Sequence, residues 1–134
     1  MRTIAEKSRK LFAVIIANHY IYIFRKEVDI LIRKAFVMNV YPDKHEEYEK
    51  RHNDIWPEMV EELRKHGASN YSIFLDEETS KLFGYVEIED EETWSKMDKT
   101  AINQKWWEFM EPVMETNPDN SPVSKDLNLV FHMD

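Results

Sequence analysis

The 134-residue chain contains no cysteine. This absence excludes a disulfide framework, a thiol nucleophile and any zinc site that is built from thiolates. No other feature of the sequence requires an oxidising compartment. We therefore expect a cytoplasmic protein.

Glycine is also scarce, with two residues in the chain, and there are five prolines. The sequence has no internal repeat and no low-complexity segment. Hydrophobic residues make up 43% of the chain and aromatic residues 13%, which is enough to build a core. At this length we expect one folded domain.

The chain has fewer basic than acidic residues. It contains 18 Lys and Arg and 26 Asp and Glu, which gives a formal net charge of −8. Such a surface is repelled by nucleic acid and by anionic membranes, so neither partner is expected. The balance also disfavours a strongly anionic substrate, although a local basic pocket would override it. The acidic runs at 46–47 and 89–92 are interpreted as solvated faces.

No hydrophobic run is long enough to span a bilayer comfortably. The longest one, residues 11–24, follows a basic start and is interrupted by Asn18 and His19. No small-residue cleavage site follows it, which argues against a signal peptide. We expect residues 1–30 to be an N-terminal extension and residues 31–134 to be the folded domain. An extra helix or strand in the extension is the alternative.

Hydrophobic periodicity predicts an α+β fold. Alternating apolar residues indicate strands over residues 33–41, 68–75, 81–88 and 127–133. Helical spacing indicates helices over residues 44–53, 57–65, 89–99 and 101–114. The order β-α-β-β-α-β is that of the ferredoxin-like sandwich, in which helices cover one face of a sheet. The other face carries aromatic residues too, so we expect it to be buried in a homodimer, sheet against sheet.

Several residues mark where the helices begin and end. Asp43 followed by Glu46 is typical of a helix start with a capping carboxylate. Pro57 predicts a break between two helices, and Gly67 predicts the end of the second. Pro112 is expected to end or kink the last helix.

The most informative pair is Tyr48 and His52, which are four residues apart on a predicted helix and therefore share a face. An imidazole titrates near neutral pH, and beside a hydroxyl group it is suited to proton transfer. Simpler readings exist, because helical histidines often lie at surfaces and tyrosines often serve only in packing.

Trp106 and Trp107 are adjacent on a later helix and diverge by about 100°. We expect one to face the core and the other to face a site. Aromatic faces beside a few polar groups suit a small, half-polar ligand such as a sugar ring. Composition alone explains both tryptophans equally well as core residues, which is how Trp56 and Trp94 are interpreted.

A metal site is not predicted. Four histidines lie in or near acidic segments, but none has the paired spacing of known zinc helices. They are His45, His52, His66 and His132.

From Leu31 onward the chain resembles the L-rhamnose mutarotase family. The matching segments are, in order, IRKAFVM at 32–38, HEEYEKRHNDIWPE at 45–58, HGA at 66–68, NY at 70–71, WW at 106–107 and NPDNSPVS at 117–124. The family's chains usually begin with Met-Ile-Arg-Lys at the position of Leu31. This suggests that residues 1–30 are upstream sequence translated from an early start codon.

The resemblance implies an isomerase that interconverts the α and β anomers of L-rhamnose without a cofactor, as a dimeric α+β barrel. It implies that His52 is the proton donor and that Tyr48, Tyr71, Trp106 and Trp107 bind the sugar. We expect His52 to start protonated and to donate to the ring oxygen. The group that accepts the anomeric proton, a second residue or a water, stays open.

Two alternatives stay open beside this hypothesis. Small dimeric α+β barrels also include cofactor-free oxygenases and haem-degrading enzymes. The chain is also explained as a sugar-binding module without catalytic activity. Fold alone does not separate these functions.

Overall fold

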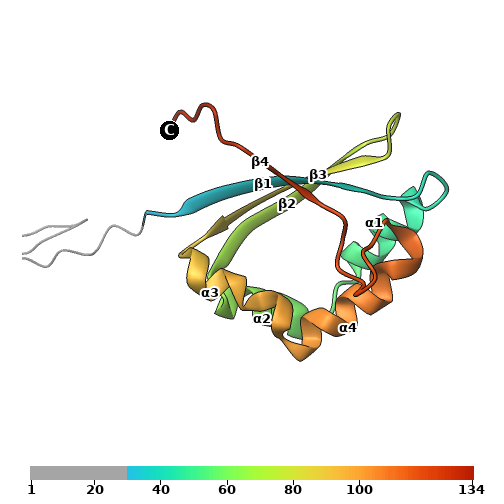
Figure 1. Cartoon of the computed structure of the whole chain (residues 1–134), viewed down its shortest axis with the longest axis horizontal. Helices are drawn as coiled ribbons and strands as arrows, with labels where there is room; N and C mark the ends of the chain where they lie inside the picture. Colours follow the sequence, from blue (N-terminus) through green and yellow to red (C-terminus); the bar gives the residue numbers. More distant parts are fainter. Residues whose placement is uncertain (1–29) are drawn as a thin grey trace, which may run out of the picture. The chain divides into compact units, whose positions relative to one another are not determined.

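The structure, a computed structural model, describes residues 30–134, which contain an antiparallel four-stranded sheet with helices on one face (Figure 1). The predicted extension lies outside the described residues, apart from Ile30. The sheet order is β2-β3-β1-β4. The strands are β1 (Ile32–Asn39), β2 (Ala68–Asp76), β3 (Lys81–Ile88) and β4 (Lys125–Leu127). The predicted α+β class is confirmed.

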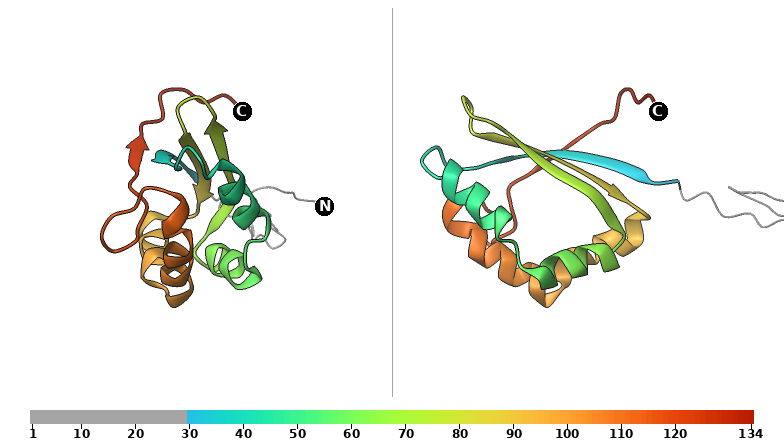
Figure 2. Two further views of the ribbon diagram at one scale, coloured as in Figure 1. Left: turned by 90° about the vertical axis from the view of Figure 1, so that its right-hand side faces the viewer. Right: turned by 180° about the vertical axis from the view of Figure 1, so that it is seen from behind.

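The helices all lie along the same face of the sheet, and the two views of Figure 2 show them on one side of the strands. Two short 3-10 turns follow the third and fourth helices. The elements are α1 (His45–Asn53), α2 (Pro57–Lys65), α3 (Glu91–Ser95), η1 (Met97–Lys99), α4 (Ala101–Met110) and η2 (Glu111–Val113).

The predicted breaks at proline are confirmed. Pro57 begins α2, where its missing N–H leaves no hydrogen bond unmade. Pro112 lies in η2, so α4 ends at Met110. The helix predicted over residues 101–114 is therefore four residues shorter, and it ends early as expected from Pro112. The capping role predicted for Asp43 is wrong, because Lys44 holds the N-cap position of α1 without a side-chain cap.

The predicted strand over 127–133 is also wrong. β4 covers Lys125–Leu127, and its register pairs it with residues 35–37 of β1. Beyond Leu127 the described chain offers no neighbouring strand, so the backbone groups there have no ladder partner. The apolar side chains that alternate in this tail, including Phe131 and Met133, are exposed.

The core lies between the covered face of the sheet and the helices. The alternation along β3 places one set of side chains in this core. Leu82, Val86 and Ile88 alternate with outward-facing residues and are almost fully buried. On the helical side the core is completed by apolar residues from η1, α4 and η2. These are Met97, Trp106, Met110 and Val113.

The opposite face of the sheet is apolar but uncovered within the described chain. Phe83 on β3 pairs with Val37 on β1 and with Phe74 on β2, so the three side chains form a row across the sheet. Phe74 exposes 67% of its surface and Phe83 exposes 39%. Among residues 30–134, no helix has both the length and the apolar character needed to cross a membrane.

Gly84 links the sheet to the cavity described below. It pairs with Phe36 across β3 and β1, and the Phe36 ring covers it so closely that a Cβ atom would overlap the ring. The same ring meets Tyr71 edge to face, with 6.2 Å between the ring centroids. Glycine at this position therefore sets where the Phe36 ring lies.

We expect Gly84→Ala to lower the free energy of unfolding by about 1–3 kcal/mol, because the added methyl group overpacks the site. Urea denaturation measures this cost. In the double variant Gly84→Ala/Phe36→Leu the smaller side chain makes room, so the two costs should be less than additive. Fully additive costs would mean that the Phe36 ring is not the constraint.

Candidate active site

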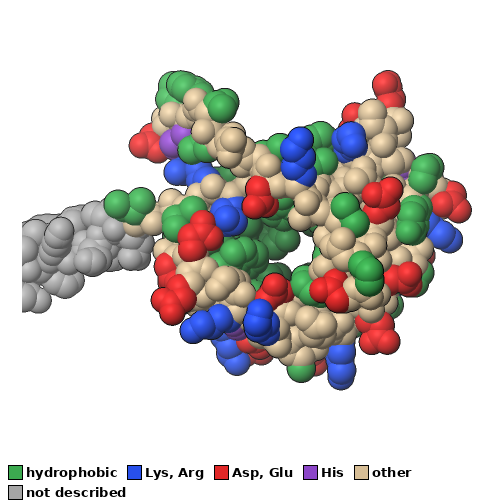
Figure 3. Space-filling model, viewed as in Figure 1, with side chains coloured by type: hydrophobic (Ala, Val, Ile, Leu, Met, Phe, Trp, Pro, Cys, Tyr) green, Lys and Arg blue, Asp and Glu red, His purple; other side chains and the backbone are tan. Residues whose placement is uncertain are grey.

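A cavity of about 1440 Å³ lies between the helices and the covered face of the sheet. Figure 3 shows it as a hollow with hydrophobic side chains inside. The structure brings all five residues predicted for the site into the lining of this one cavity. They are Tyr48, His52, Tyr71, Trp106 and Trp107.

α1 holds Tyr48 and His52 on the same face, as the spacing of four residues predicts. Their rings lie 4.4 Å apart, centroid to centroid, in a tilted arrangement. The His52 Nδ1 atom is 3.1 Å from the Tyr48 carbonyl oxygen. Because a carbonyl only accepts hydrogen bonds, Nδ1 carries a proton, and Nε2 is the atom that gains or loses one.

Burial lowers the pKa of the His52 imidazole, and the hydrogen bond to the Tyr48 carbonyl opposes this effect. The neutral ring therefore dominates at neutral pH, in contrast to the expectation that His52 starts protonated. A lowered pKa also makes the imidazolium a stronger acid when it does form.

The two tyrosines cannot ionise near neutral pH. Burial raises the pKa of Tyr71 to about 12. Burial, with a smaller contribution from the nearby Tyr71 hydroxyl, also raises the pKa of Tyr48 above its ordinary value. Tyr71 still exposes 39% of its surface, and because it lines the cavity this surface is available to a ligand. Both hydroxyl groups are suited to hydrogen bonding and not to proton abstraction.

Trp106 forms the centre of an aromatic cluster. Its indole meets His52 at 5.3 Å and Trp56 at 5.1 Å between ring centroids, edge to face in both cases. Trp106 is buried in the core and also lines the cavity. The same residue therefore belongs both to the core and to the site. Trp107 is half-buried and lines the cavity as well. Trp56 packs on the core, as expected.

Several lining residues were not found from the sequence. Asn103 lies on α4 one turn before the two tryptophans, a spacing that could have indicated it. His45 also lines the cavity, and its Nε2 lies 2.8 Å from the Ser80 hydroxyl. From the loop at 117–124, which carried no named role, Asn117 and the stretch 121–124 reach the lining.

The residues described by the structure include no group of three or more histidine or acidic side chains arranged to hold a metal ion.

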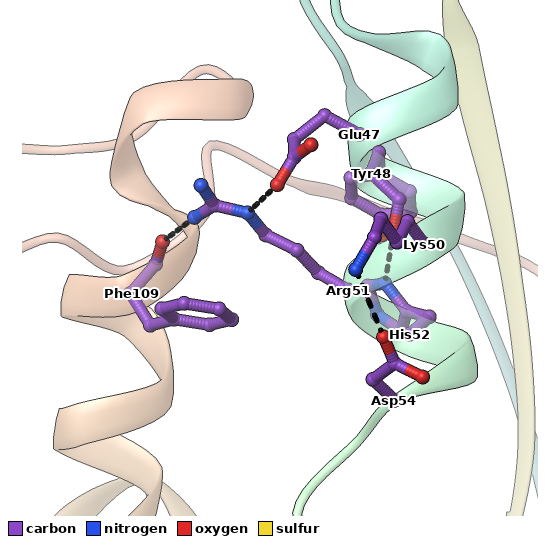
Figure 4. A network of polar contacts seen from close by, with 7 residues as sticks. All are labelled: Glu47, Tyr48, Lys50, Arg51, His52, Asp54 and Phe109. Carbon is purple, nitrogen blue, oxygen red and sulfur yellow. Dashed lines mark hydrogen bonds and ion pairs between the residues drawn. The ribbon is translucent and has the colours of Figure 1, made fainter.

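Arg51 connects the two helices that carry the site, as Figure 4 shows. Its Nε donates to Glu47 at 2.6 Å, and another guanidinium nitrogen donates to the Phe109 carbonyl on α4. The guanidinium also lies 4.3 Å from the centre of the Phe109 ring. The hydrogen bond from Arg51 holds the pKa of the Glu47 carboxyl below its usual value. The side chain thus ties α1 to α4 on the outer side of the site.

The fold and the cavity define a class of protein. It is an α+β protein whose covered sheet face forms one wall of a cavity, with a histidine among aromatic rings and hydroxyl groups. Such a lining suits a small neutral ligand with polar and apolar sides.

Comparison with known proteins gives the family. The family model for L-rhamnose mutarotase matches residues 33–133. The L-rhamnose mutarotase of Oceanobacillus iheyensis is 76% identical over 102 residues, which cover 76% of this chain and 98% of the relative. The chain belongs to the L-rhamnose mutarotase family.

Solved structures agree with this assignment. The crystal structure of the L-rhamnose mutarotase from Formosa agariphila matches with a TM-score of 0.72 and 41% identity, over 77% of this chain and 99% of that chain. A protein from Nitrosomonas europaea described as an antibiotic biosynthesis monooxygenase matches with a TM-score of 0.52 at 14% identity, over 71% of this chain and 84% of that one. The second likeness shows the fold alone.

We expect Arg51→Ala to lower the free energy of unfolding by about 1–2 kcal/mol, because the cation–π contact and the hydrogen bond to the Phe109 carbonyl are both lost. Urea denaturation measures the change. Lys50→Ala is the matched control, since it removes an exposed i,i+4 ion pair with Asp54 and should cost less. Equal costs for the two variants would contradict a role for Arg51 in joining the helices.

Proposed function

We propose that this chain interconverts the α and β anomers of L-rhamnose in the cavity, with His52 as its acid/base group. L-rhamnose mutarotase activity follows from membership of the family, and it makes the chain an isomerase of rhamnose metabolism. The observation that supports the role of His52 is its exchangeable Nε2, in a cavity lined by Tyr48 and Tyr71. A cytoplasmic location is part of the proposal.

Mutarotation opens the pyranose to the free aldehyde and closes it on the other face. Opening requires one proton at the ring oxygen and the loss of one from the anomeric hydroxyl group, and closing reverses both transfers. His52 donates from Nε2 to the ring oxygen during opening and takes the proton back during closing. A water or a second hydroxyl group accepts the anomeric proton. No cofactor takes part in either transfer.

The remaining lining residues hold the sugar. Tyr48 and Tyr71 keep their hydroxyl protons, so they donate and accept hydrogen bonds to the sugar hydroxyl groups. Trp106 and Trp107 pack on the apolar side of the ring and on its methyl group. Because Trp106 also touches His52, the wall that contacts the sugar and the group that transfers the proton are held together.

We expect His52→Ala and His52→Gln to lower kcat/KM for anomer exchange about 10²- to 10⁴-fold, which is the usual contribution of one acid/base group. Saturation-transfer proton NMR of L-rhamnose measures the exchange. Glutamine keeps a polar side chain but has no proton that titrates in this range, so it separates the chemistry from packing. Exchange that stays at the wild-type rate in folded His52→Gln would contradict the assigned role.

The pH dependence of the wild-type rate follows from the lowered pKa of His52. The imidazolium donor accumulates only as the pH falls below the ordinary value of 6.5. Enzyme-catalysed kcat/KM should therefore rise as the pH falls through this range and then level off, and His52→Gln should lack the rise. A decrease over the same range would instead indicate that neutral His52 acts as a base.

We propose that the chain is a homodimer in which two sheets pack face to face. The uncovered row of Val37, Phe83 and Phe74 supports this arrangement, because such an apolar surface is costly in water. The exposed apolar side chains of the C-terminal tail, such as Leu129 and Phe131, lie beyond the edge strand β4 and would find cover against a second copy.

Light scattering after gel filtration tests the dimer. We expect the wild type at twice the chain mass of 16.2 kDa and Phe83→Asp at the mass of one chain, because a buried unpaired carboxylate is strongly unfavourable. Lys105→Asp on the exposed side of α4 is the control and should remain dimeric. A wild type that runs as one chain at micromolar concentration would contradict the proposal.

A further inference from the structure

Asn103 stands out in the part of the chain that the structure describes, because it is the one buried polar side chain recorded there. It exposes 5% of its surface and lies in the first turn of α4. Its side chain lines the cavity.

The carboxamide of Asn103 forms no hydrogen bond with any residue between 30 and 134. Its backbone N–H donates to the Thr100 hydroxyl oxygen at 3.3 Å, which caps the helix and does not involve the side chain. Buried side-chain amides in folded proteins are normally paired, because burial without a partner is unfavourable. An unpaired amide in a cavity wall is therefore available to a ligand.

The position of Asn103 on α4 places it beside the proposed sugar site. Asn103, Trp106, Trp107 and Met110 follow the spacing of one helical face, and all four line the cavity. Asn103 is three residues from Trp106, a rise of about 4.5 Å along the helix. Trp106 in turn contacts His52. The carboxamide thus lies about one helical turn from the indole that touches the acid/base group.

We propose that the Asn103 carboxamide binds two neighbouring hydroxyl groups of the sugar, and this rests on the proposed function. A carboxamide presents an acceptor, Oδ1, next to donors on Nδ2. A pair of adjacent sugar hydroxyl groups presents the complement, one donating and one accepting. Tyr48 and Tyr71 each offer one hydroxyl group. Asn103 differs from them because its carboxamide can form hydrogen bonds with two sugar hydroxyl groups at the same time.

This arrangement makes Asn103 a determinant of specificity. When the sugar lacks a hydroxyl group that a buried polar group requires, the group stays unpaired in the complex, and the sugar is rejected more strongly than by an apolar wall. The proton transfer at His52 does not involve the carboxamide. Its loss should therefore weaken binding and leave the chemical step nearly unaffected.

Asn103→Leu tests the proposal, because leucine has a similar volume and no polar atoms. We expect the KM for L-rhamnose to rise at least about 5-fold, the effect of losing two neutral hydrogen bonds, with kcat changed less than about 3-fold. Saturation-transfer NMR gives both constants. The melting temperature without sugar should stay the same or rise, since an unpaired buried amide is removed.

Gln104→Leu is the matched control. It removes a carboxamide from the exposed side of the same helix, where the side chain donates to the Asp98 carbonyl at 2.6 Å. Its KM should equal that of the wild type. Asn103→Ala serves as a second variant if leucine prevents folding, and the same rise in KM is expected.

Deoxy sugars identify the contacts. A 2-, 3- or 4-deoxy analogue that lacks one of the two hydroxyl groups bound by Asn103 should bind the wild type more weakly than L-rhamnose, and Asn103→Leu should weaken its binding less than it weakens the binding of L-rhamnose. Tryptophan fluorescence titration measures these affinities. If the loss of the hydroxyl group and the Asn103→Leu substitution weaken binding additively for all three analogues, the proposal is overturned.

The outcomes separate this proposal from the one on which it rests. If the wild type accelerates exchange and both Asn103 variants keep its KM within about 2-fold, the carboxamide is paired with a resident water and the proposal is overturned. If the wild type accelerates nothing, the proposed function itself fails. A raised KM in both Asn103 variants, with Gln104→Leu unchanged, supports the assignment.

Discussion

The contact of Trp106 with His52 is the interaction on which the rest of the site depends. The indole is buried in the core and at the same time forms part of the cavity wall. It joins α4 to α1, and through Trp56 it also joins the segment between α1 and α2. Because a packed core allows few positions for so large a ring, the indole restricts where the imidazole beside it can lie.

Burial shifts the pKa values of the tyrosines and of the histidine in opposite directions. Removal from water disfavours whichever form of a group is charged, so it raises the pKa of Tyr48 and Tyr71 and lowers that of His52. A phenol is already neutral at pH 7 and burial strengthens this preference, so of these three groups the imidazole is the one whose ordinary pKa of 6.5 lies near neutrality. In the proposed function this difference in pKa is the reason why the hydroxyl groups bind the sugar and the imidazole transfers the proton.

The parts of this structure that sequence predicts are those set by local spacing. Tyr48 and His52 share a face because of helical geometry, and the bounds of β3 follow from strict alternation. The tail beyond Leu127 alternates in the same way but is not a strand, because a strand needs a partner that the local pattern does not reveal. Asn103 was missed for a related reason, since burial without a hydrogen-bond partner is a property of the folded chain.

The two faces of the sheet serve separate purposes because side chains alternate along each strand. On β3, Leu82 and Val86 face the cavity and the core, whereas Phe83 and Tyr85 face outward. A shift of one residue in the register would exchange these two sets, so selection on either face also fixes the other. The likeness to the Nitrosomonas europaea protein at 14% identity shows a shared fold alone, and a fold by itself does not determine a function. In the proposed function, the mutarotase activity therefore depends on the small set of side chains on the covered face and on the helices opposite, above all on His52 and the aromatic rings around it.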